Sequence, residues 1–150
     1  APEKMTGLSF EHLYSERVLF VVRAGHPLSR EDSDIFGSFG DYPVLMPTRN
    51  SIIRPFVESF LIANGVPSLP NQIETVSDAF GRAFLRKSDA IWIISEGVVA
   101  ADISDGLLCA LPIDTTDTRG PVGLTIRADT PPSLSLSVLM QAIREAAGAQ

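Results

Sequence analysis

Hydrophobic and polar positions along the chain form two kinds of stretch. Short apolar stretches between turn residues are typical of buried strands, and apolar residues three or four positions apart are typical of helices. Strands are therefore predicted at residues 17–23, 44–46, 71–76, 90–94, 107–111 and 122–127. Helices are predicted at residues 29–39, 52–64, 78–87, 96–103 and in a last segment capped by Ser133 or Ser135. This alternation predicts an α/β fold whose largely parallel sheet is covered by helices on both faces.

The stretch at residues 44–61 combines a buried strand, a polar turn and a helix that starts between Ile52 and Arg54. Two apolar sets, Ile52, Phe56, Phe60 and Ile53, Val57, Leu61, have helical spacing. The turn consists of Thr48, Arg49, Asn50 and Ser51. Because the first amides of a helix lack intrahelical partners and carry the positive end of its dipole, this turn suits a carboxylate or a phosphate. Two simpler interpretations remain open: Arg49 is a solvated turn residue, and Ser51 only caps the helix.

A second junction between a strand and a helix lies at residues 75–78. In a parallel sheet such junctions meet at the carboxyl edge, where ligands bind. Ser77 is therefore a further candidate ligand contact, with helix capping as the simpler alternative. The third junction, at residues 95–97, contains Glu96 and is a poorer anion site for that reason.

Composition narrows the possible partners. The 150 residues are 45% hydrophobic and 20% charged, as in a soluble globular protein. A net charge of −6 argues against binding nucleic acid through this chain. A single cysteine, Cys109, excludes an internal disulfide and indicates a reducing, cytoplasmic compartment. No signal-peptide pattern and no apolar run of about 18 residues appear, so no membrane partner is expected.

Candidate catalytic and metal-binding groups are few. His12 and His26 are the only histidines, and neither has a second histidine, a cysteine or clustered carboxylates at metal-ligand spacing. His26, in a Gly-His-Pro turn, is interpreted as structural, and Cys109, in an apolar strand, as a buried inert thiol. No nucleophile, nucleotide or dinucleotide motif occurs. The sequence therefore predicts no metal, no cofactor and no enzyme activity.

Several segments, taken in order, resemble the effector-binding region of LysR-type transcriptional regulators. They are RVLFVVRAGHPL at residues 17–28, MPTRNS at 46–51, NGVP at 64–67, ETV at 74–76, residues 90–95, and GLTIR at 123–127 with the helix after it. The strand followed by Ala-Gly-His-Pro-Leu is the most specific of them. Residues 46–56 and 73–99 also resemble the branch of this family that activates genes for protocatechuate breakdown. The effectors of that branch are carboxylated ring-cleavage products.

The resemblance implies a two-lobed, periplasmic-binding-protein-like (type 2) domain whose first lobe is incomplete in this chain. Residues 1–15 would end the first lobe and cross over, residues 16–121 would form the second lobe, and residues 122–150 would return to the first. The turn at residues 48–52 would line the effector cleft between the lobes. Relatives that sense peroxide carry a reactive cysteine near this turn; this chain has none, which disfavours redox sensing.

The resemblance also implies partners. A small carboxylate would bind at Thr48, Arg49, Asn50 and Ser51, with Ser77 added from its place at the second junction. The intact protein would be a homo-oligomer, a dimer or a tetramer. DNA would be bound only by a winged helix-turn-helix outside these residues. The strand and helix from Val122 onward would present an apolar face that is expected to contact another lobe or another chain. Two other classes stay open: a solute-binding protein for a small carboxylate, and a small α/β enzyme.

Overall fold

The computed structural model describes residues 3–30 and 34–148. Contacts between Cα atoms divide the chain into two compact units. The larger unit is Arg17–Arg119, and the smaller unit combines Ala1–Glu16 with Gly120–Gln150. None of the described helices is both long enough and apolar enough to cross a bilayer.

The larger unit is built on a five-stranded sheet with the order β5-β4-β6-β3-β7. The strands are β3 (Val18–Arg23), β4 (Val44–Met46), β5 (Gln72–Glu74), β6 (Ile91–Ser95) and β7 (Leu108–Ala110). β4 pairs in parallel with β5 and β6, whereas β3 pairs antiparallel with β6 and β7. Four strands therefore run in one direction and β3 runs against them. The largely parallel sheet expected from the pattern is present, with β3 as the exception.

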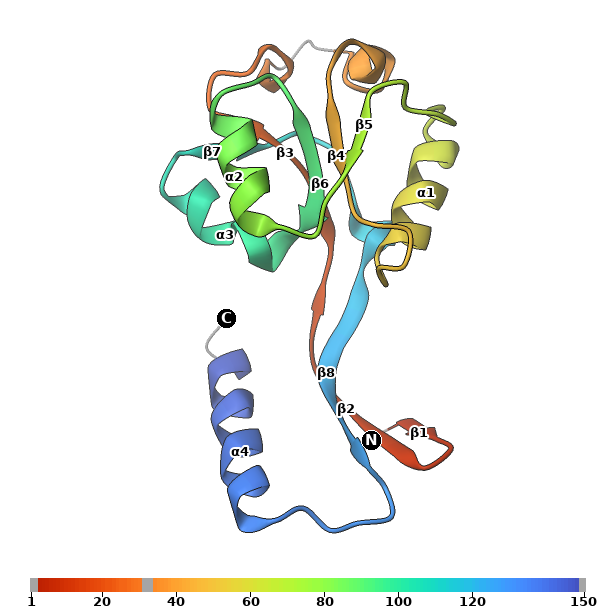
Figure 1. The fold of residues 1–150 in the computed structure, drawn as a ribbon, viewed down its shortest axis with the longest axis vertical. Helices are drawn as coiled ribbons and strands as arrows, with labels where there is room; N and C mark the ends of the chain where they lie inside the picture. Colours follow the sequence, from red (N-terminus) through yellow and green to blue (C-terminus); the bar gives the residue numbers. More distant parts are fainter. Residues whose placement is uncertain (1–2, 31–33, 149–150) are drawn as a thin grey trace. The chain divides into compact units, whose positions relative to one another are not determined.

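Helices cover both faces of this sheet (Figure 1). On one face α1 (Arg54–Ala63) packs on alternate residues of β3, because Val57 and Phe60 belong to the same buried cluster as Phe20. On the other face α2 (Asp78–Arg86) and α3 (Glu96–Ser104) contribute Leu85 and Val99 to a second cluster. β3 lies between two strands and is buried on both sides, which explains its unbroken run of apolar residues.

α1 begins at Arg54, the last of the start positions that the sequence predicts. Ile52 precedes the helix and is 87% exposed, so the predicted stripe through Ile52 and Phe56 is wrong, while Val57, Phe60 and Leu61 are buried as expected. The end of the helix is as predicted: Gly65 has a φ of 81°, and the Val66 amide donates to the Leu61 carbonyl.

The apolar spacing of Ala79, Phe80, Ala83 and Phe84 predicts the buried face of α2, but of these four only Phe84 packs against the core. Ala79 and Ala83 are exposed, and Phe80 is 42% exposed. The buried residues are Gly81 and Leu85, because Gly81 packs directly against the ring of Trp92. A hydrophobicity pattern does not count glycine as apolar, so this contact left no signal in the sequence.

The predicted acidic helix at residues 29–39 is not a single α-helix in its described parts. Pro27–Ser29 and Phe36–Asp41 form short 3-10 helices, and residues 31–33 lie outside the described residues. His26 caps the first of these: its Nδ1 accepts from the Leu28 amide at 3.0 Å, and its Nε2 lies 2.8 Å from the Asp89 carbonyl. His26 is therefore structural, as predicted.

The smaller unit contains an antiparallel sheet of β1 (Glu3–Met5), β2 (Leu8–Glu16) and β8 (Gly120–Arg127), together with α4 (Leu134–Gly148). Residues 8–15 are predicted to be a connection, but they belong to strand β2. The prediction is wrong because the pairing partner of this strand, β8, lies more than a hundred positions away along the chain. Ser133 caps α4 by accepting from the Leu136 amide at 3.2 Å. Leu134, Val138 and Leu139 on α4 remain exposed, so contact of this helix with another lobe or chain stays a prediction.

Replacing Gly81 with alanine should destabilise the larger unit. The new Cβ would lie 2.5 Å from Cζ2 of the buried Trp92. Overpacking costs about 1–3 kcal/mol and outweighs the helix-propensity gain of about 1 kcal/mol. We expect urea denaturation to show a loss of about 1–2 kcal/mol. In the control Gly40→Ala, the nearest atom would be 4.0 Å away, and no loss is expected. Equal stabilities of both variants would contradict the packing.

Acid should weaken the attachment of α4 to β2. Arg144 donates to both carboxylate oxygens of Glu11 at 2.7 and 2.8 Å, and these hydrogen bonds hold the pKa of Glu11 below its ordinary value of 4.5. The stability they contribute is present above that value and is lost as the pH falls through the folded pKa. In thermal unfolding, Glu11→Gln should be less stable than wild type at neutral pH and equally stable in strong acid. A pH-independent difference would contradict this.

Candidate functional site

The carboxyl ends of β4, β5 and β6 meet at one edge of the larger unit's sheet, because these three strands are parallel. A pocket of about 180 Å³ lies there. We call it the hydroxyl pocket. It is lined by Pro47, Thr48, Ser51, Ile53, Thr75, Val76, Ser77, Asp78, Trp92, Ile93 and Ile94. The lining comes from the turns after β4 and β5 and from the end of β6, which is where ligands bind in open α/β sheets.

The turn after β4 contributes a hydroxyl without a partner. Two successive turns precede α1: the Ser51 amide donates to the Thr48 carbonyl, and the Arg54 amide donates to the Ser51 carbonyl. Ile53 occupies the N-cap position and makes no capping bond, so Ser51 does not cap the helix. The Ser51 Oγ is buried and has no hydrogen-bond partner among the described residues. Such a group costs about 1–3 kcal/mol, and ligand binding is one way to satisfy it.

The turn after β5 contributes two hydroxyls that each accept one hydrogen bond from a backbone amide. Thr75 Oγ1 accepts from the Ser77 amide at 3.0 Å, and Ser77 Oγ accepts from the Phe80 amide at 3.1 Å. Ser77 therefore caps α2 and lines the pocket at the same time. A hydroxyl has one donor hydrogen and two acceptor lone pairs, so each of these groups keeps its O–H hydrogen and one lone pair. These two hydroxyls present donors.

The remaining lining is apolar apart from Thr48 and Asp78. Trp92 is 2% exposed and is followed in β6 (Ile91–Ser95) by Ile93 and Ile94, which also line the pocket. Val76 is 81% exposed. Asp78, in the first turn of α2, is the only ionisable residue in the lining, so no cationic side chain lines the pocket.

The structure brings together three of the five predicted site residues. Thr48, Ser51 and Ser77 line the hydroxyl pocket. Asn50 is exposed and outside the lining. The Arg49 side chain is 84% exposed, and its Nε lies 3.6 Å from Oε1 of Glu74. The assignment of these residues to an effector site stays a prediction.

Arg54 is a residue whose importance the sequence did not reveal. Its side chain is 7% exposed; Nε donates to Glu58 at 2.8 Å, and Nη1 donates to the Pro47 carbonyl at 2.6 Å and to Glu74 at 2.9 Å. One guanidinium thus ties the turn after β4 to α1 and to β5. Only the Glu58 contact, four positions along the helix, could have been found from spacing.

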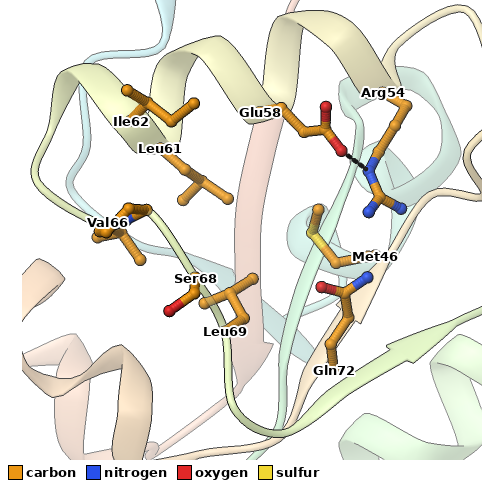
Figure 2. Close-up of a pocket in the computed structure, with 10 residues that line it drawn as sticks. Met46, Arg54, Glu58, Leu61, Ile62, Val66, Ser68, Leu69 and Gln72 are labelled. Carbon is orange, nitrogen blue, oxygen red and sulfur yellow. Dashed lines mark hydrogen bonds and ion pairs between the residues drawn. The ribbon is translucent and has the colours of Figure 1, made fainter.

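A second pocket, of about 250 Å³, lies between α1 and the segment that leads to β5 (Figure 2). It is lined by Met46, Arg54, Glu58, Leu61, Ile62, Val66, Pro67, Ser68, Leu69 and Gln72. The buried side-chain N and O atoms that lack a partner in the described chain belong to Ser51 and Thr115, neither of which lines this pocket. The hydroxyl pocket is therefore the better candidate for a polar ligand.

Metal binding has no cluster of side chains to support it in residues 3–30 and 34–148. No three histidine, cysteine or carboxylate side chains in these ranges could hold a metal ion together. Cys109 is half-buried, and its thiol lies 3.5 Å from the Ala110 carbonyl.

The family profile of the LysR substrate binding domain matches residues 1–148, and the chain belongs to this family. Among curated relatives, the HTH-type transcriptional regulator PcaQ of Agrobacterium fabrum is 74% identical over 148 residues. That alignment covers 99% of this chain and 48% of PcaQ, so the chain spans about half the length of this relative. The expected resemblance to LysR-type regulators, and within them to PcaQ, is confirmed.

Solved structures show the same fold. The apo regulatory domain of HypT from Salmonella typhimurium has a TM-score of 0.70 at 15% identity, covering 98% of this chain and 68% of that one. The regulatory domain of CcmR from Synechocystis PCC6803, in complex with 2-PG, has a TM-score of 0.71 at 14% identity, covering 98% and 71%. The chain has the expected periplasmic-binding-protein-like type 2 fold.

Substituting Arg54 should cost far more stability than substituting Arg49, although both contact Glu74. Arg54→Met would leave the Pro47 carbonyl and the Glu74 carboxylate without their main donor, at a cost of about 2–3 kcal/mol. Arg49→Met removes a mostly exposed ion pair and should change stability by less than about 0.5 kcal/mol. Chemical denaturation of both variants provides the measurement. Similar losses would contradict the central role of Arg54.

Proposed function

We propose that this chain is the effector-sensing regulatory domain of a bacterial LysR-type transcriptional regulator. Its effector would be a carboxylated intermediate of protocatechuate catabolism that controls transcription, as expected for the PcaQ group. Family membership and 74% identity to PcaQ support this proposal over a solute-binding protein or a small α/β enzyme. As a regulator's sensing domain, it would perform no catalysis.

The observation that carries the proposal is the unpartnered hydroxyl of Ser51 in a pocket of hydroxyl donors. The Thr75 and Ser77 oxygens already accept from backbone amides, so both hydroxyls can donate outward. Such a wall is complementary to a ligand that offers acceptor atoms. A carboxylate meets this requirement, and a hydrogen bond to a charged group is stronger than one between neutral groups.

The apolar side of the pocket is complementary to the rest of such a ligand. Ile53, Trp92 and Ile94 provide carbon surface next to the hydroxyls. A ring-cleavage product of an aromatic acid has a planar carbon skeleton between carboxylates, so hydroxyl donors and apolar wall would each contact the matching part. Ligand sites commonly combine apolar walls with a few polar groups that fix orientation.

The lobes and partners expected for the family complete the proposal. The second lobe would comprise residues 16–121, and residues 1–15 and 122–150 would belong to the first; the division of contacts after Glu16 and before Gly120 supports this. The intact protein would be a cytoplasmic homo-oligomer that contacts DNA through a separate winged helix-turn-helix. The effector would act by binding one arrangement of the lobes better than another.

Ser51→Ala should weaken effector binding without weakening the fold. We expect calorimetry on the intact protein to show about tenfold weaker binding of carboxymuconate, the tricarboxylate formed by opening the protocatechuate ring. Because the hydroxyl has no partner in the free domain, the free energy of unfolding should stay the same or rise.

The matched control is Ser59→Ala, which removes an exposed hydroxyl of α1 outside the pocket. It should leave both the affinity and the stability unchanged. If Ser51→Ala bound carboxymuconate as tightly as wild type, Ser51 would be removed from the site and the proposal would lose its main support.

A further inference from the structure

One carboxylate oxygen, Oε1 of Glu74, is shared by three side chains at the end of β5. Arg54 Nη1 lies 2.9 Å from it, Gln72 Nε2 3.4 Å and Arg49 Nε 3.6 Å. The contact with Arg54 is short and belongs to a guanidinium that is 7% exposed. Of the three contacts, that of Arg49 is the longest, and the Arg49 side chain is 84% exposed.

The attachment of Arg49 to Glu74 is weak for two reasons. The distance of 3.6 Å exceeds that of a charge-assisted hydrogen bond, and the Arg49 side chain is 84% exposed, so water screens the attraction. Little free energy is therefore needed to move the Arg49 guanidinium to another anion.

The ion pair is placed next to the hydroxyl pocket. Arg49 directly follows Thr48, and Glu74 directly precedes Thr75, and both threonines line the pocket. The two turns are held together because the Thr75 amide donates to the Met46 carbonyl at 3.2 Å. A carboxylate bound to the hydroxyls would meet Asp78 but no cation in the lining. Arg49 and Arg54 are both adjacent in sequence to lining residues, but the Arg54 side chain is 7% exposed and the Arg49 side chain is 84% exposed.

We propose that Glu74 and an anionic ligand compete for Arg49. In the free domain Glu74 holds the Arg49 guanidinium outside the pocket; in the bound domain Arg49 leaves Glu74 and pairs with a ligand carboxylate. Glu74 is then a positioning residue that lowers the affinity for anions, and Arg49 is a direct contact that favours charged over neutral ligands. This inference rests on the function proposed above.

The test uses calorimetry of carboxymuconate binding to the intact regulator. Glu74→Gln keeps an oxygen that can accept from Arg54 but removes the charge that holds Arg49. We expect two- to fivefold tighter binding, the scale of an exposed ion pair. In an Arg49→Ala background, the same Glu74→Gln change should have no effect on affinity. A purely structural role of Glu74 would weaken binding rather than tighten it.

The matched control is Glu58→Gln. Glu58 also pairs with Arg54, at 2.8 Å. Among the described residues, Glu58 forms no ion pair with Arg49. The substitution changes the net charge by the same amount and should leave the affinity unchanged. If Glu74→Gln fails to fold, Arg49→Ala alone decides: it leaves the contact between Glu74 and Arg54 intact and should weaken carboxymuconate binding about tenfold.

Two results would overturn the inference while sparing the proposed function. One is an affinity gain from Glu74→Gln that persists without Arg49, which would show a general charge effect. The other is wild-type affinity in both Glu74→Gln and Arg49→Ala. If the wild-type regulator did not bind carboxymuconate at all, the assignment of this effector and the competition for Arg49 would both fail.

Discussion

The parallel pairing of β4 with both β5 and β6 is the constraint on which the candidate site depends. Leu45 lies opposite Ile73 on one side and Trp92 on the other, so three strands end at the same edge of the sheet. The turns that follow β4 and β5 are therefore neighbours, although almost thirty positions separate them along the chain. Every hydroxyl of the pocket is placed by this pairing.

A buried guanidinium then fixes the turn after β4 against β5. Arg54 contacts the Pro47 carbonyl and the Glu74 carboxylate, and both lie directly beside the threonines of the pocket. The backbone hydrogen bonds of this turn leave Ser51 at a position where no protein group satisfies its hydroxyl. Structural interactions thus hold the turn, while the Ser51 hydroxyl has no partner in the described chain. In the proposed function, fold stability and ligand binding would depend on different side chains of the same turn.

Local patterns in the sequence predicted the elements that line the pocket. The apolar run at residues 44–46, the polar turn and the serine before α2 were sufficient to place Thr48, Ser51 and Ser77 at one edge of a sheet. The capping role of Ser77 also followed from its position, because an N-cap depends only on neighbours in the chain.

Features that depend on distant residues could not be predicted. The reversed direction of β3 is set by its pairing with β6 and β7, and an apolar run looks the same in either direction. The buried face of α2 follows from the contact of Gly81 with Trp92. The burial of Arg54 requires Glu74, which lies twenty positions further along. Each of these arises from tertiary contacts that leave no periodic signal.

Hydrogen–deuterium exchange of the intact regulator, with and without carboxymuconate, tests most directly whether carboxylate effectors bind at the hydroxyl pocket of the larger unit. Binding there predicts slower exchange for amides in residues 47–54 and 75–81, which form the two turns of the pocket and the start of α2. Protection confined to residues 58–72, which include most of the lining of the pocket beside α1, would contradict it.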